Sequence, residues 1–115
     1  MLTMNDDLEG ALKEYLKLME EEEYFEAHEV LEEAWHPLRL KDHTLKNLVK
    51  GLINGAVSFE HLKRNKKDAA RKALHVMESY ERYKDVYNDR IEFAELFKKA
   101  CMKIQILKSK YPEVF

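Results

Sequence analysis

Apolar residues recur along this chain at the spacing of helices rather than of strands. Between residues 5 and 21 they lie three or four positions apart, which gathers them on one side of a helix. The same pattern predicts further helices over residues 24–36, 45–64, 66–84 and 89–110. The connections are short, as is usual for antiparallel neighbours in one domain. The sequence therefore predicts a single all-α domain over residues 1–115, a compact antiparallel helical bundle.

Polar residues and prolines predict where these helices begin and end. Pro37 is expected to stop the second helix near His36, because proline lacks an N–H group and disfavours helix at the preceding residue. A second proline, Pro112, follows the last helix. Candidate N-terminal caps are Asn5, Asp42 or Thr44, Asn65, and Asn88 or Asp89 with Glu92 reaching back.

Composition supports this class and excludes others. The 115 residues include 37% charged residues but only three Gly and two Pro, so helix formers dominate. The single Cys101 cannot form an internal disulfide or a paired-cysteine zinc site, which favours a reducing compartment. Neither a signal peptide nor a membrane span is apparent, so we expect a cytoplasmic protein. The net charge of −2 argues against general binding to nucleic acid or to anionic membranes.

Two polar residues fall on the apolar side of the second helix. His28 and Glu32 are one turn apart and project between Phe25 and Trp35, whereas Glu26 points to the solvated side. Burying either group without a partner costs about 1–3 kcal/mol, and more for a charge. The spacing therefore predicts that they bond to each other or to a third group.

The third helix repeats this pattern. Glu60 falls between the apolar Val49 and Ile53 on the helical projection, and His61 flanks the same side. If the second and third helices pack as an antiparallel pair, His28, Glu32, Glu60 and His61 could converge in one polar pocket under Trp35.

Four interpretations of this pocket remain open. A His–Glu bond could be a buried polar network that fixes how the helices dock. His28 and Glu32, with Glu60 or His61, could bind a divalent metal ion, although the stretch reads H-E-x-x-E and not the zincin pattern H-E-x-x-H. Acid–base catalysis by Glu32 and His28 is a third interpretation. In the fourth, Trp35, Phe25 and Tyr24 form the walls of a small-molecule pocket.

The residues from Phe25 to Trp35 also carry a resemblance. They read F-x-A-H-E-x-L-E-x-x-W, which resembles the signature of the bacterial and archaeal domain-of-unknown-function family 309. A second, partial match follows at Lys50-Gly51-Leu52-Ile53-Asn54, then His61 and Arg64-Asn65, so that the resemblance spans residues 24–74. Lys50 and Asn54 stand where the family tends to have Gln, and Arg64 where it has Gly. The resemblance implies a compact helical fold and no established activity.

Three other features suggest contacts. The basic residues Lys63, Arg64, Lys66, Lys67, Arg71 and Lys72 surround the third connection and could touch phosphate or an acidic partner. Gly51, Gly55 and Ser58 form a strip that lets another helix approach closely. Ile91, Met102 and Ile106 form a second apolar stripe on the last helix, which is a candidate homo-oligomer contact.

These observations favour a non-catalytic binding or interaction module. The alternative is a metal-dependent enzyme, with hydrolysis as one option, that uses His28 and Glu32 and takes Glu60 as a third ligand. The two hypotheses differ in what conservative substitutions at these positions should change: stability in the first, metal binding or activity in the second.

Overall fold

The computed structural model describes residues 8–40, 46–87 and 94–115. This part of the chain holds five helices and no strand: α1 (Leu8–Glu20), α2 (Tyr24–Leu40), α3 (Lys46–Lys63), α4 (Lys67–Tyr87) and α5 (Ala94–Ser109). The predicted all-α class is therefore confirmed, and each helix coincides with a predicted one. The proposed caps near residues 5, 42–44 and 88–92 lie outside the described residues.

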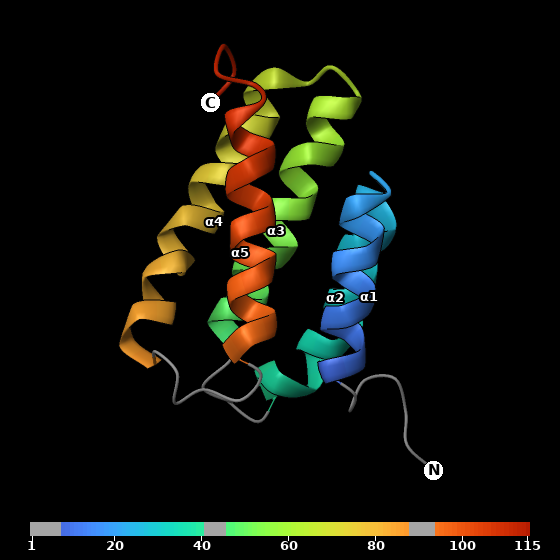
Figure 1. Cartoon of the computed structure of the whole chain (residues 1–115), viewed down its shortest axis with the longest axis vertical. Coiled ribbons are helices and arrows are strands. Elements are labelled where there is room, and N and C mark those ends of the chain that lie inside the picture. The colour runs from blue at the N-terminus through green and yellow to red at the C-terminus, as the bar shows by residue number, and fades with distance from the viewer. Residues whose placement is uncertain (1–7, 41–45, 88–93) are drawn as a thin grey trace.

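Helix α3 occupies the middle of the bundle. It packs against α2 on one side and α4 on the other, while α1 covers α2 and α5 packs on α1 and, less closely, on α3. Figure 1 shows α4 diverging from α5 towards the end of the molecule opposite the C-terminus. Helices α4 and α5 have fewer close contacts than the packed pairs.

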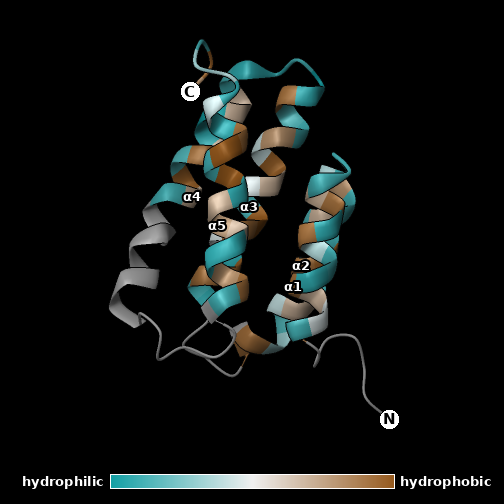
Figure 2. Ribbon diagram, viewed as in Figure 1, coloured by the Kyte–Doolittle hydropathy of each residue, from teal (hydrophilic) through white to brown (hydrophobic). Residues whose placement is uncertain are grey.

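The buried faces are those that the apolar spacing predicts. In α1 the buried residues are Leu8, Ala11, Leu12, Tyr15 and Met19, and in α5 Phe97, Ala100, Ile104 and Leu107 join Cys101 in the core. Figure 2 shows hydrophobic and hydrophilic residues in alternating bands along the helices, as expected where each helix has one buried face.

Small residues on α3 allow the neighbouring helices to approach closely. An added Cβ at Gly55 would lie 2.6 Å from Ile104 Cδ1 of α5, so the absence of a side chain there makes room for the last helix. Ser58 is fully buried, and its Oγ donates a 2.9 Å hydrogen bond to the carbonyl of Ala70 on α4. The predicted small-residue strip therefore serves packing.

Helices α1 and α3 end in the same way. Glu22 and Asn65 have φ angles of 61° and 62°, in the left-handed region. The N–H of Glu23 bonds to the carbonyl of Leu18, and that of Lys66 to the carbonyl of His61, each at 2.8 Å. These bonds define Schellman motifs. The predicted N-cap role of Asn65 is therefore wrong: it terminates α3, and the carbonyl of Lys66 accepts the first bond of α4.

The prediction that α2 stops before Pro37 is also wrong. The helix continues to Leu40 with Pro37 inside it. Because this proline lies in the last turn, it removes one helical hydrogen bond near an end where the carbonyls already lack partners. The next residue, Leu38, packs against the core, and this burial offsets the loss.

One face of α5 is apolar and exposed. Met102 is 64% exposed and Ile106 49%, on the side away from the core, as predicted. Ile91 lies outside the described residues. Whether a second copy of the chain covers this face stays a prediction. No helix in the described ranges is both long and apolar enough to cross a membrane.

Candidate functional site

Helices α2 and α3 lie antiparallel, and three ring contacts fix their register. The Tyr24 and Phe59 rings are 5.7 Å apart at one end, near which the Arg64 guanidinium lies over the Phe25 ring at 5.9 Å. At the other end Lys50 Nζ lies 4.5 Å from the centre of the Trp35 ring. The surface between these ends holds the polar residues singled out in the sequence, and we call it the signature seam. It comprises Phe25, His28, Glu32, Trp35, Lys50, Glu60 and Arg64.

The His28–Glu32 pair forms, but at the edge of the core rather than inside it. His28 Nε2 lies 3.6 Å from Glu32 Oε2, and the two side chains are 20% and 44% exposed. The prediction of a buried pair is therefore wrong. His28 Nδ1 is 2.9 Å from the carbonyl oxygen of Phe25. Since a carbonyl only accepts hydrogen bonds, Nδ1 carries the hydrogen, and in the neutral ring Nε2 presents its lone pair towards Glu32.

Glu60 is engaged by Arg64, which directly follows α3. Its Oε2 accepts a 2.6 Å hydrogen bond from Arg64 Nε, and the Glu60 side chain is 17% exposed. The Phe25 ring lies between Arg64 and His28, whose ring is 5.3 Å away. The seam therefore links Glu60 to Glu32 through Arg64, Phe25 and His28. Both acids were predicted from the sequence, but the role of Arg64 was not, although its spacing of four from Glu60 is a usable signal.

The residues predicted to meet in one pocket under Trp35 are instead spread along the seam. Trp35 lies beside Lys50, and Glu60 is ten residues further along α3, which corresponds to about 15 Å of helix. His61 is half-buried at the end of α3, where its carbonyl takes part in the Schellman motif. In the described ranges no three His, Cys, Asp or Glu side chains are grouped so that they could hold a metal ion.

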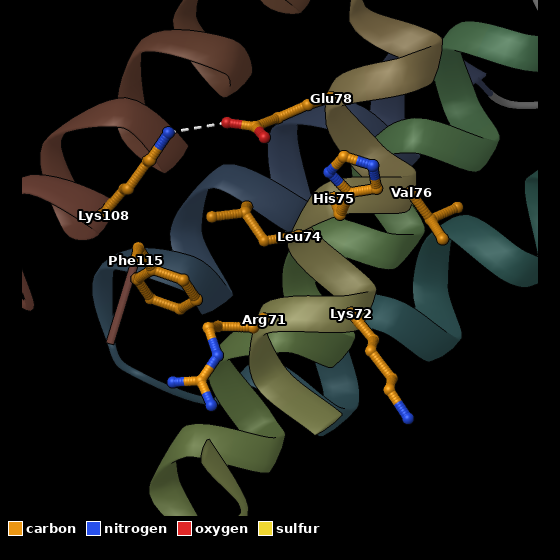
Figure 3. Close-up of a pocket in the computed structure, with 8 residues that line it drawn as sticks. All are labelled: Arg71, Lys72, Leu74, His75, Val76, Glu78, Lys108 and Phe115. Atoms are coloured by element: carbon orange, nitrogen blue, oxygen red, sulfur yellow. Dashed lines mark hydrogen bonds and ion pairs between the residues drawn. The ribbon is translucent and has the colours of Figure 1, made fainter. Parts of the chain in front are cut away.

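A hollow of about 540 Å³ lies between the first half of α4, the end of α5 and the C-terminal segment, and we call it the α4–α5 groove (Figure 3). Its lining residues come from α4, α5 and the C-terminal segment: Arg71, Lys72, Leu74, His75, Val76, Glu78, Lys108 and Phe115. Figure 3 shows the Glu78–Lys108 ion pair at one end and Arg71 at the other, with Leu74 and Phe115 between them. Its volume falls in the range of roughly 300–1,000 Å³ typical of small-molecule sites.

The groove combines an apolar floor with a cationic rim. Leu74 is 2% exposed, and Phe115 packs edge-on against the core residue Phe59. Arg71, Lys72 and Lys108 are opposed by one lining carboxylate, Glu78, which lies 2.6 Å from Lys108 Nζ. Arg71 also bonds to Asp68 and, at 3.4 Å, to the carbonyl of Val114. Arg71 and Lys72 belong to the basic cluster seen in the sequence, whereas Lys108 of α5 and Phe115 of the C-terminal segment come near them only in the fold.

Fold and site together define a small all-α domain with a polar seam and an adjacent basic groove. Residues 12–73 match the family model described as Domain of unknown function (DUF309). This match covers more than half of the chain and includes the signature seam, so the chain belongs to that family and the resemblance carried by residues 25–35 is confirmed. No curated protein and no solved structure matches the chain.

Proposed function

We propose that this domain is a non-catalytic binding module that holds a small organic anion in the α4–α5 groove. The observation that carries the proposal is the pairing of an apolar floor, Leu74 and Phe115, with three cations on the rim. A ligand with an apolar body and one carboxylate or similar group matches both parts. The Lys108–Glu78 ion pair supports the fit, because a carboxylate already occupies this end of the groove.

The signature seam supports a structural role by contrast. Its charged groups are engaged with one another or with aromatic rings, and they are spread along two helices rather than aimed at one point. A catalytic site needs groups that face a common position where a reacting atom can sit. The seam therefore docks α2 on α3 and leaves the binding function to the groove.

The same ion pair also suggests how a ligand competes for the groove. The Glu78 carboxylate and a ligand carboxylate would both seek Lys108 Nζ, while the ligand's apolar body lies against Leu74 and Phe115. Removing the Glu78 charge should therefore strengthen anion binding, and removing the Lys108 charge should weaken it. Opposite effects from the two partners of one ion pair are not expected from a general loss of stability.

Binding of naphthoate, followed by calorimetry, tests the proposal. We expect saturable binding that Lys108→Met weakens several-fold and Glu78→Gln strengthens, with Lys99→Met as the matched control. Lys99 lies on the opposite side of α5, is exposed and carries the same charge. The uncharged carboxamide of naphthoate should bind more weakly than the acid.

Two results would contradict the proposal. One is the absence of saturable naphthoate binding to the intact chain. The other is an equal loss of binding in Lys108→Met and Lys99→Met, because this outcome would reflect net charge alone and not the groove.

A metal-dependent enzyme that uses His28 and Glu32 remains the second candidate, and one observation favours it. The bond from His28 Nδ1 to a backbone carbonyl orients the ring as in many metal sites, and it leaves Nε2 and Glu32 Oε2 3.6 Å apart at a half-exposed edge. Glu60, the predicted third ligand, is held by Arg64. Elemental analysis after purification without a tag or chelator separates the candidates: stoichiometric metal that His28→Ala and Glu32→Ala both abolish would favour the enzyme.

We also infer that the domain works in the cytoplasm. Cys101, the single cysteine of the sequence, is buried in the core as a thiol, which suits a reducing compartment. Fractionation of cells that express the untagged chain tests this location, and recovery with the membrane or secreted fractions would contradict it.

A further inference from the structure

A second, more enclosed hollow lies at the end of the bundle where three chain segments meet. It has a volume of about 270 Å³, and we call it the end hollow. Its lining residues come from the α1–α2 turn, the α3–α4 turn and the C-terminal segment: Glu22, Tyr24, Phe59, Leu62, Lys63, Lys67, Tyr111, Glu113 and Val114. Lys63 Nζ donates a 3.0 Å hydrogen bond to the carbonyl of Glu22, which ties the two turns together.

Tyr24 is the residue of this hollow that points most clearly to a ligand. It is only 5% exposed, and its ring packs against Phe59 at 5.7 Å, yet its hydroxyl has no hydrogen-bond partner among the described residues. No side-chain oxygen or nitrogen in the described ranges is both fully buried and without a partner, so the Tyr24 hydroxyl reaches the hollow that its residue lines. There it can bond to water or to a bound molecule.

Tyr24 is neutral at pH 7, as phenols normally are. Burial, followed by the nearby Glu22 and Tyr111, raises the pKa of Tyr24 to about 12. Its hydroxyl therefore keeps its proton and can donate to an anionic group such as a carboxylate.

The charges around the end hollow are balanced, unlike those of the α4–α5 groove. Lys63 and Lys67 contribute positive charge, and Glu22 and Glu113 contribute an equal number of negative charges. None of these four side chains forms an ion pair within the described part of the chain. A ligand of one sign would leave the opposite pair of charges unmatched, whereas a zwitterion can satisfy both. Phe59, Leu62 and Val114 add an apolar wall.

From this combination we infer that the end hollow binds a small zwitterion of the free amino acid class, with an apolar side chain against Phe59. The ligand carboxylate lies near Tyr24 and the two lysines, and its ammonium group near Glu22 and Glu113. This inference does not depend on the α4–α5 groove, because the two hollows have no lining residue in common.

The test is an amide chemical-shift titration of the intact chain with leucine, N-acetylleucine and leucinamide. We expect leucine to give saturable shifts in residues 22–24, 62–67 and 111–114. The two derivatives, which lack one charge each, should bind several-fold more weakly. Tyr24→Phe should also weaken leucine binding several-fold while leaving the thermal midpoint nearly unchanged, because the ring and its packing on Phe59 remain.

Lys67→Met and Lys99→Met provide a matched charge control, in which only the first should weaken binding. The inference is overturned if leucine gives no saturable shifts at millimolar concentration, which means that water alone fills the hollow. It is equally overturned if N-acetylleucine binds as well as leucine, or if Tyr24→Phe leaves the affinity unchanged.

Discussion

The signature seam and the C-terminal end of the bundle use polar residues in opposite ways. Along the seam, Glu60 accepts a hydrogen bond from Arg64, and His28 lies beside Glu32. Lys50 lies over the Trp35 ring, so these polar groups contact one another or a ring. At the C-terminal end, a buried phenol and several charges face open hollows instead. Unusual residues in a sequence motif can therefore serve docking, while the groups available to a ligand lie where separate segments meet.

The largest expected effect comes from removing the aromatic ring that lies between the two hollows at the C-terminal end. Phe59 is 1% exposed and contacts Tyr24 and Phe115, which line the two different hollows. Phe59→Ala should lower the free energy of unfolding by about 3–5 kcal/mol, the usual cost of emptying a buried aromatic site. Urea denaturation measures this loss, and a value below about 1 kcal/mol would mean that the end of the bundle is not held by this ring.

Two tyrosines allow a direct comparison of a partnered and an unpartnered phenol. Tyr15 is fully buried and donates a 2.7 Å hydrogen bond to the carbonyl of Leu52, whereas the Tyr24 hydroxyl has no partner among the described residues. Tyr15→Phe should therefore cost about 1–2 kcal/mol, and Tyr24→Phe close to nothing. Equal losses in thermal or urea denaturation would show that Tyr24 also makes a stabilising bond.

The same residues predict alkaline instability. Burial raises the pKa of Tyr15 well above 10.0, with Cys101 adding to the effect, and it raises the pKa of Tyr24 to about 12. In the unfolded chain both phenols lose their protons near pH 10. Above that pH the folded chain binds more protons than the unfolded chain, so the free energy of unfolding should fall as the pH rises above 10. Tyr15→Phe should flatten this decline, and an unchanged pH profile in that variant would contradict the assignment.

The seam should give the smallest effects. Because the Glu32 side chain is 44% exposed, Glu32→Gln and His28→Gln should each change stability by less than about 1 kcal/mol. A loss of 3 kcal/mol or more, of the order of about 3–5 kcal/mol seen for broken buried pairs, would restore the buried network that the sequence suggested. Urea denaturation of both variants and of the double variant measures the coupling.

Helix periodicity predicted most of the fold because buried faces dominate the energetics of each helix. It failed at Pro37, where the cost of one lost bond in a last turn is small, and at Asn65, which adopts a left-handed conformation that also suits a helix end. The pairing of His28 with Glu32 followed from their spacing, but their exposure did not. That exposure depends on how far α1 and α3 cover α2, which a projection of one helix cannot give.

The hollows were harder to predict than the seam. Residues 110–115 form turns that carry no helical periodicity, yet they place Tyr111, Val114 and Phe115 against α3 and α4. Such contacts depend on the course of the chain after the last helix. The basic cluster around residues 63–72 was visible in the sequence, but the apolar residues Leu74 and Phe115, which lie beside Arg71 in the groove, were not linked to it.

The central claim is that the α4–α5 groove binds the ligand while the signature seam docks α2 on α3. Its most direct test is an amide chemical-shift map of the intact chain titrated with naphthoate. The account predicts that the largest saturable shifts fall in residues 71–78 and around Lys108 and Phe115, with the amides of His28 and Glu32 nearly unmoved. Largest shifts along residues 25–35 would contradict it and make the signature seam the binding site.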